Sequence, residues 1–260
     1  MFSLKNKTIV ITGGAGYLGS AMSEALVAFG ATLFIFGHND SKNKKFIDGI
    51  IKKYGMDTCR GVLYDLDDNN SIKHAIKVVM EETKQIDVLI NNAAYYSCVK
   101  PLHEYTYNEW ETGLNGTING VFRITKEVLP IMMQQHGGSI INIGSMYGVV
   151  APNMDIYGDS GQNNPANYGA GKAAIIQLTK YIASVYAKYG IRANTISPGP
   201  FPNKIVQENK AFINELSKKN PMGCIGQPED LQGIVVYLAS EASRYMNGQN
   251  ISIDGGWTSW

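Results

Sequence analysis

The chain has 260 residues and a net charge of +1, with 44% hydrophobic and 17% charged residues. This composition is typical of a globular protein, and the length suits one large open α/β domain. The near-neutral charge gives no electrostatic basis for binding nucleic acid or a membrane surface, so neither partner is predicted.

Cys59, Cys98 and Cys224 lie far apart, with no C-x-x-C pair and no histidine spacing that would close a metal site. They indicate reduced thiols in a cytoplasmic protein, and no metal is predicted. The strand-like segment Thr8–Ile11 begins too soon after the amino terminus for a signal peptide or a membrane span.

Short β-branched runs alternate with longer amphipathic segments along the chain. The expected strands are Thr8–Thr12, Thr32–Phe36, Thr58–Tyr64, Asp87–Ile90, Ser139–Ile143, Arg192–Ser197 and Asn250–Ile253. The expected helices are Leu18–Phe29, Ser71–Thr83, Val121–Gln135, Asn167–Tyr189 and Pro228–Ser240. This alternation predicts one α/β domain over residues 1–260, with a seven-stranded, doubly wound parallel sheet covered by helices on both faces. Ligands of such folds bind beyond the carboxyl ends of the strands.

A glycine-rich turn follows the first strand and opens a helix: Thr12-Gly13-Gly14-Ala15-Gly16-Tyr17-Leu18-Gly19. Gly13 permits the tight turn, Gly16 lets the backbone approach a pyrophosphate, and Gly19 lets the helix pack close to the strand. The amino terminus of the helix then faces the phosphate charge. The sequence therefore predicts a dinucleotide site here.

Tyr168 and Lys172 lie four residues apart on a predicted helix and so project from one face. A free phenol has a pKa of about 10, and lowering it to about 7 takes roughly 4 kcal/mol, which an ammonium in a dry cleft can supply. Tyr168 is therefore a candidate general acid/base.

Further motifs follow the later strands in a fixed order. They are Asn91-Asn92-Ala93-Ala94, Ser145, Ser197-Pro198-Gly199 and Asp254-Gly255-Gly256. Together with the glycine turn and the Tyr168/Lys172 pair, this order resembles the short-chain dehydrogenase/reductase family over essentially the whole chain. The resemblance implies a Rossmann fold and hydride transfer between a nicotinamide cofactor and a secondary alcohol or ketone.

The resemblance also implies the roles of individual residues. Tyr168 moves the substrate hydroxyl proton, Lys172 lowers the pKa of Tyr168 and bonds the nicotinamide ribose, and Ser145 orients the substrate. Asp65 is expected to bond the adenine amino group, or else to cap the following helix, and Asn91 to steady the central sheet. The implied cofactor-binding residues are Gly13, Gly16, Tyr17, Leu18, His38, Asn39, Asp65, Leu66, Asn92, Ala93, Ala94, Tyr168, Lys172, Pro198 and Gly199.

The glycine turn departs from the family pattern, because Tyr17 stands where a glycine is expected. The resulting spacing resembles the branch of the superfamily that contains sugar-nucleotide epimerases and dehydratases. An epimerase or dehydratase that uses transient oxidation is therefore one alternative, and a nucleotide-sensing protein without turnover is another. The length and the carboxyl-terminal motifs favour the single-domain oxidoreductases.

A second departure concerns the asparagine that holds a relay water in the family. Counting back from Gly120-Val121-Phe122 places Thr117 at that position, with Asn115 as the other candidate. A threonine hydroxyl could hold the same water, so Thr117 is predicted as the fourth catalytic residue.

The third departure concerns cofactor choice. Gly37 stands where NAD-specific members carry an aspartate at the end of the second strand. No carboxylate there repels a 2′-phosphate, and His38, Asn39 and Lys42 could bond one. NADP is therefore expected over NAD, with Asp40 able to rescue NAD binding, and Gly37→Asp is expected to shift preference toward NAD.

Between Ser145 and Tyr168 lie 22 residues, more than the family usually carries. The extra segment, roughly 153–167, is polar and turn-rich, and it is expected to close over the substrate as a mobile loop. Aromatic and amide groups beside it suit a sugar or sugar derivative. The expected substrate residues are Ser145, Tyr95, Tyr147, Tyr157 and Phe201, with Tyr96 and Trp257 as further candidates.

The family resemblance implies a homotetramer. The helices carrying Thr117 and Tyr168 would pair with their twofold mates through an apolar face that includes Val121, Ile124, Val128 and Met132. The last strand would pair across a second axis.

Overall fold

The computed structural model describes residues 1–55, 58–158 and 163–260. Its seven strands form one parallel sheet in the order β3-β2-β1-β4-β5-β6-β7. The strands are β1 (Thr8–Thr12), β2 (Thr32–Gly37), β3 (Cys59–Leu63), β4 (Val88–Asn91), β5 (Gly138–Ile143), β6 (Ile191–Pro198) and β7 (Asn250–Ile253). The predicted doubly wound sheet is confirmed, and its order reverses between β1 and β4.

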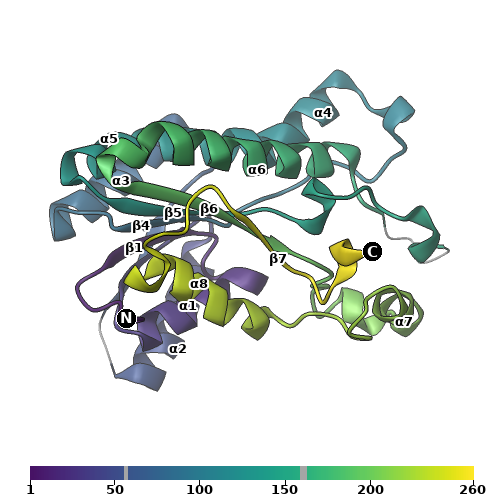
Figure 1. Ribbon diagram of the computed structural model, residues 1–260, viewed down its shortest axis with the longest axis horizontal. Helices are drawn as coiled ribbons and strands as arrows, with labels where there is room; N and C mark the ends of the chain where they lie inside the picture. The colour runs from purple at the N-terminus through teal and green to yellow at the C-terminus, as the bar shows by residue number, and fades with distance from the viewer. Residues whose placement is uncertain (56–57, 159–162) are drawn as a thin grey trace.

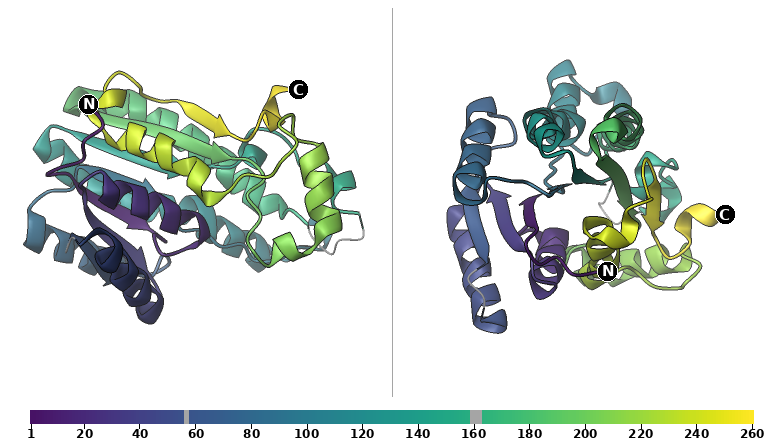
Figure 2. Two further views of the ribbon diagram at one scale, coloured as in Figure 1. Left: turned by 90° about the horizontal axis from the view of Figure 1, so that it is seen from below. Right: turned by 60° about the vertical axis from the view of Figure 1, so that its left-hand side comes forward.

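Helices cover both faces of this sheet (Figures 1 and 2). They are α1 (Tyr17–Ala28), α2 (Asp40–Tyr54), α3 (Asn69–Thr83), α4 (Tyr107–Leu114), α5 (Gly120–Gln135), α6 (Ala166–Tyr186), α7 (Lys210–Lys218) and α8 (Gln232–Ala239). One core cluster joins the sheet to α1, α2 and α8, and a second joins it to α3, α5 and α6. The central strands β1 and β4 are buried along their whole length, and all their residues except Thr8, Thr12 and Asn91 are apolar.

The structure adds three helices that the apolar pattern did not mark: α2, α4 and α7. Few residues of these helices are buried. The buried residues of α2 are Asn43, Ile47 and Ile50, and those of α7 are Phe212 and Leu216. So few apolar positions give a weak helical period, which explains why the sequence did not reveal these elements.

Hydrogen bonds join the carboxyl ends of β1 and β4. The Thr12 hydroxyl accepts from the backbone N–H groups of Asn92 at 3.0 Å and Ala93 at 2.9 Å. The Asn92 side chain donates in return to the carbonyl oxygens of Thr12 and Gly13. Behind it, Asn91 Nδ2 donates to Asn142 Oδ1 at 2.7 Å, as expected of a residue that steadies the central sheet. The glycine turn is therefore held at the point where the strand order reverses.

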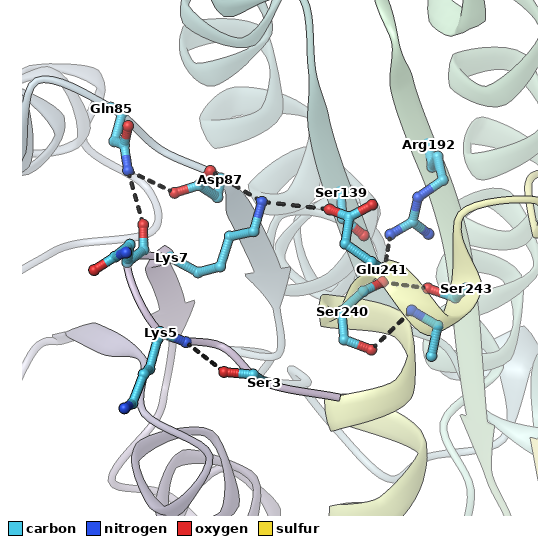
Figure 3. A network of polar contacts seen from close by, with 12 residues as sticks. Ser3, Lys5, Lys7, Gln85, Asp87, Ser139, Arg192, Ser240, Glu241 and Ser243 are labelled. Atoms are coloured by element: carbon cyan, nitrogen blue, oxygen red, sulfur yellow. Dashed lines mark hydrogen bonds and ion pairs between the residues drawn. The ribbon is translucent and has the colours of Figure 1, made fainter. Parts of the chain in front are cut away.

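A polar network closes the opposite, amino edge of the sheet (Figure 3). Lys7 lies 3.5 Å from carboxylate oxygens of both Asp87 and Glu241, and Arg192 donates to the carbonyl oxygen of Leu238 at 3.0 Å. A hollow of about 850 Å³ beside Glu241 also lies at this edge. Tyr168 and Lys172 are not part of its lining, because both lie at the carboxyl edge of the sheet.

Two absences hold for the described residues. None of their helices is long and apolar enough to cross a membrane. They also contain no group of three histidine, cysteine or acidic side chains placed to hold a metal ion.

Candidate active site

A cleft of about 830 Å³ opens at the carboxyl edge of the sheet. It lies against the glycine turn, the ends of β2 to β6 and the start of α6, and its volume falls within the range of about 300–1,000 Å³ typical of ligand pockets. All fifteen residues predicted to bind the cofactor line this one cleft. The structure thus brings them together, while their individual roles stay predictions.

The glycine turn has no space for a side chain at Gly13, Gly16 or Gly19. Gly13 has φ of +64°, a conformation that favours glycine, and a Cβ on Gly16 would lie 2.9 Å from the Gly13 carbonyl oxygen. A Cβ on Gly19 would collide with that same oxygen. No side chain caps the amino terminus of α1, where Gly16 is the N-cap residue. The cleft therefore offers the first N–H groups of α1 to an anion, which fits the pyrophosphate of a dinucleotide.

Lys172 lies buried at the inner end of the cleft, with 4% of its surface exposed. Its Nζ donates to the carbonyl oxygen of Ile143 at 2.7 Å and lies 5.5 Å from the ring centroid of Tyr168. Burial lowers the pKa of Lys172 to about 8, because desolvation disfavours the ammonium form.

The pKa of Tyr168 is raised in this structure, chiefly by burial, while a hydrogen bond with Ser145 acts in the opposite direction. Lys172 is not among the groups that shift this pKa, so its expected role in lowering it stays a prediction. The Lys172 ammonium donates its hydrogen bond to the Ile143 carbonyl at the end of β5, and it lies over the ring of Tyr168. With its pKa raised by burial, Tyr168 is a protonated phenol at neutral pH.

Thr117 lies in a π-helical turn, Asn115–Asn119, between α4 and α5. Its buried hydroxyl donates to the carbonyl oxygen of Gly113 at 2.8 Å and lies so close to Gly171 of α6 that no Cβ fits there. Thr117 does not line the cleft in the described part of the chain. Its place in a proton relay stays a prediction.

The other relay candidate, Asn115, belongs to a network on the adenosine side. Its Oδ1 accepts from Arg123 Nη2 at 3.0 Å, and Arg123 Nη1 lies 2.9 Å from Asp67 Oδ1. The hydroxyl of Tyr95 donates to the other carboxylate oxygen of Asp67 at 2.5 Å. Tyr95 was expected at the substrate, but its hydroxyl is engaged by the loop that carries Asp65.

Asp65 shapes this same loop. Its Oδ1 accepts from the backbone N–H of Asp67 at 2.9 Å, and its own N–H donates to the hydroxyl of Ser71 at 2.9 Å. Asp65 also lines the cleft, which is compatible with the expected adenine contact. The helix-capping alternative is wrong, because Asp68 is the N-cap residue of α3 and accepts from the N–H of Asn70 at 2.8 Å.

Aromatic rings flank Tyr168 at the outer end of the cleft. The ring of Tyr96 meets that of Tyr168 edge to face, with centroids 6.3 Å apart. Phe201, from the segment after β6, lines the same end and packs on Gly226. The substrate end therefore has Tyr96 and Phe201 as walls, with Ser145 at its base.

The insertion before α6 is anchored in a small core. Ile156 and Tyr157 are buried in a satellite cluster with Met146, Phe212, Leu216 and Trp257. The hydroxyls of Tyr147 and Tyr157 bond each other at 2.8 Å, and neither residue lines the cleft where the structure describes it. Ile156 and Tyr157 thus anchor part of the insertion. Its closure over the substrate as a mobile loop stays a prediction, and Asp159 and Gln162 lie outside the described residues.

At the adenosine end, Asn39 caps α2. Its Oδ1 accepts from the N–H of Lys42 and from the hydroxyl of Ser41, both at 2.9 Å. Asn43, one turn further along α2, is buried and lines the cleft, although the sequence analysis did not single it out. The sequence did contain a sign that Asn43 is functional. Asn43 shares the buried face of α2 with Ile47 and Ile50, where an apolar residue would be expected.

Comparison with known proteins identifies relatives that match nearly the whole chain. A family model described as enoyl-(acyl carrier protein) reductase matches residues 14–258. The 3-oxoacyl-(acyl-carrier-protein) reductase FabG of Thermotoga maritima is 34% identical over 259 residues, covering 97% of this chain and 98% of that protein. A gluconate 5-dehydrogenase of Gluconobacter oxydans is 28% identical over 261 residues, covering 99% of this chain and 97% of that protein.

A solved structure extends the comparison to three dimensions. The gluconate 5-dehydrogenase from Burkholderia cenocepacia, in complex with NADP and tartrate, is 29% identical and superposes with a TM-score of 0.88. The match covers 100% of this chain and 98% of that one. The chain therefore belongs to the short-chain dehydrogenase/reductase family, whose members are oxidoreductases that act on CH–OH groups with NAD(P).

Proposed function

We propose that the chain works as one domain that transfers hydride between NADP and a secondary alcohol or ketone of a sugar or sugar derivative. One observation carries the proposal. Tyr168, Lys172 and Ser145 line one cleft together with the glycine turn. This supports the proposal, because a nicotinamide whose pyrophosphate lay on α1 would extend toward these side chains.

The bound nicotinamide supplies the chemistry that the side chains lack, because it gives or accepts the hydride. Ser145 holds the substrate oxygen by a hydrogen bond. Tyr168, kept protonated by burial, donates its proton to that oxygen as the carbonyl carbon gains hydride, so that C=O becomes CH–OH. In the opposite direction the tyrosinate takes the same proton back. Lys172 lies within reach to bond the ribose hydroxyls.

The sugar assignment rests on chemistry at the outer end of the cleft. Tyr96 and Phe201 offer apolar faces for the carbon side of a sugar, and Asn203 offers an amide for its hydroxyls. The similarity to the two gluconate 5-dehydrogenases supports a polyhydroxylated substrate.

The preference for NADP rests on charge. Gly37 leaves the end of β2 without a carboxylate, while His38 and Lys42 line the cleft beside it. A 2′-phosphate would therefore meet no fixed negative charge at this position.

A substrate screen tests the proposal. Purified protein is mixed with sugars, sugar acids, sugar alcohols, 3-oxoacyl thioesters and hydroxysteroids. Each compound is tested with NADP and with NAD, in both the oxidised and the reduced form. The absorbance of the reduced nicotinamide is followed. We expect turnover with a polyhydroxylated compound and loss of turnover in Tyr168→Phe. Product formed with no net change in nicotinamide would instead indicate the epimerase or dehydratase alternative, and cofactor binding without any turnover would indicate a sensor.

We further propose a homotetramer in the cytoplasm. The family resemblance supports the tetramer, and the three free cysteines support a reducing compartment. A monomeric mass in sedimentation at micromolar concentration would refute the tetramer, and fractionation of cells that make the protein tests the location.

A further inference from the structure

We propose that Asn43 determines which adenosine ribose the cleft accepts, in place of the strand-end residue that Gly37 lacks. This inference rests on the proposed binding of a nicotinamide dinucleotide. Asn43 comes from the first part of α2, and its side chain lies beside Gly37 at the end of β2.

The Asn43 amide occupies the space that a strand-end side chain would need. A Cβ built on Gly37 would lie 2.6 Å from Asn43 Oδ1 and 2.9 Å from Asn43 Nδ2, both far inside normal contact distance. Asn43 is 3% exposed, and a Cβ built on Gly61 of β3 would lie 3.4 Å from its own Cβ. The Asn43 side chain, which comes from α2, thus occupies the position that the aspartate at the end of β2 takes in NAD-specific members of the family.

The orientation of the amide is set by one hydrogen bond. Nδ2 donates to the carbonyl oxygen of Gly37 at 3.3 Å, and the reversed orientation would put two acceptor oxygens together. Oδ1 is therefore the atom left to accept a hydrogen bond, and among the described residues we find no donor bonded to it. Asn43 lines the cleft, so a ribose hydroxyl bound there would provide a donor.

The amide is neutral and donates through Nδ2, whereas an aspartate is charged and only accepts. Both offer an acceptor oxygen to a ribose hydroxyl, but a carboxylate would also repel a 2′-phosphate, and the amide does not. His38 and Lys42 line the same end of the cleft. Asn43 therefore keeps a ribose acceptor at this position while leaving the cleft open to NADP.

The same geometry corrects one expectation from the sequence. Gly37→Asp was expected to shift preference toward NAD, but the new Cβ would collide with Asn43. We now expect that single variant to lose stability and to bind both dinucleotides weakly. The carboxylate can instead be introduced at position 43, or at position 37 once Asn43 has been shortened.

The test compares Asn43→Asp with the matched control Asn203→Asp, which adds the same charge to the same cleft at the segment after β6. Binary dissociation constants for NADP and NAD are measured by calorimetry, with no substrate present, and thermal unfolding checks the fold. We expect Asn43→Asp to lower affinity for NADP relative to NAD at least tenfold. Asn203→Asp should leave this ratio within about twofold, because its charge lies away from the adenosine end.

The double variant Gly37→Asp/Asn43→Ala provides the second arm, because it removes the obstructing amide and carries the acid at the end of β2. We expect it to prefer NAD and to unfold at a higher temperature than Gly37→Asp alone. A ratio within twofold of wild type in a folded Asn43→Asp or in the folded double variant overturns the inference. Failure of the wild-type protein to bind either dinucleotide would instead overturn the proposed function.

Discussion

The hydroxyl of Tyr17 donates to the carbonyl oxygen of Pro202 at 2.8 Å, across 185 positions of sequence. Gln207 Nε2 donates to the same hydroxyl at 3.1 Å and to the same carbonyl at 2.8 Å. The residue that breaks the usual glycine pattern thus ties the dinucleotide turn to the segment after β6. That segment carries Phe201 at the substrate end, so Tyr17 links the two ends of the cleft.

Tyr17→Phe should loosen this link without disturbing the turn, because the ring is kept and only the hydroxyl is lost. A hydrogen bond contributes a net of about 0.5–1.5 kcal/mol, so we expect KM for the substrate to rise about 2- to 12-fold. Proteolysis within 200–208 should also become faster. The control is Tyr54→Phe, which removes the hydroxyl that donates to Glu24. Equal kinetics in the two variants would show that the Tyr17 link is irrelevant to the cleft.

Tyr168→Phe should lower kcat by about 10²–10⁴, because the ring remains but the transferable proton does not. Its affinity for the dinucleotide should stay near that of wild type. Lys172→Ala should reduce both turnover and cofactor affinity, since its ammonium also holds the end of β5 through Ile143. Steady-state kinetics and calorimetry separate these effects. A Tyr168→Phe enzyme that retains more than about a tenth of the wild-type rate would refute the acid/base role.

The depressed pKa of Lys172 predicts a dependence of stability on pH. Its value in the folded protein is about 8 against an ordinary 10.5, so between these limits the unfolded chain holds a proton that the folded chain does not. The cost of burying Lys172 is therefore complete below pH 8 and fades as the pH rises toward 10.5.

Lys172→Met removes this titration and serves as the reference. We expect the free energy of unfolding of wild type relative to Lys172→Met to increase by about 2 kcal/mol from about pH 7 to about pH 9.5. Urea unfolding at the two pH values measures this difference in the free energy of unfolding. Tyr168 titrates in both proteins, so its contribution cancels from the difference. A constant difference across this range would mean that Lys172 keeps its ordinary pKa in the folded protein.

The satellite cluster under the insertion predicts that its described part contributes to stability. Ile156→Ala empties a site that is 2% exposed and should lower the free energy of unfolding by about 2–4 kcal/mol. Met154→Ala, two residues earlier and 52% exposed, should change it by less than about 0.5 kcal/mol. Similar small values for both variants would show that the segment does not pack as a core element.

Much of the fold could be predicted from the sequence because buried parallel strands are mostly apolar. The runs that became β1, β4 and β7 fall within a residue or two of their observed bounds. The order of motifs also placed Ser145 and Tyr168 in one cleft, since parallel strands end at the same edge of a sheet. By contrast, α2 and α7 were missed because few of their residues are buried.

Contacts between distant segments were decided only by the tertiary structure. No pattern near Tyr95 shows that its hydroxyl bonds Asp67, and none near Tyr17 indicates Pro202 as its partner. The amide of Asn43 stands against Gly37 because α2 packs back onto β2, a relationship that strand and helix periods do not specify. Local sequence thus determined the elements and the edge where chemistry gathers, because each of these depends on nearby residues. Side-chain direction, charge environment and cofactor discrimination depend on packing between elements, and only the folded chain determines that.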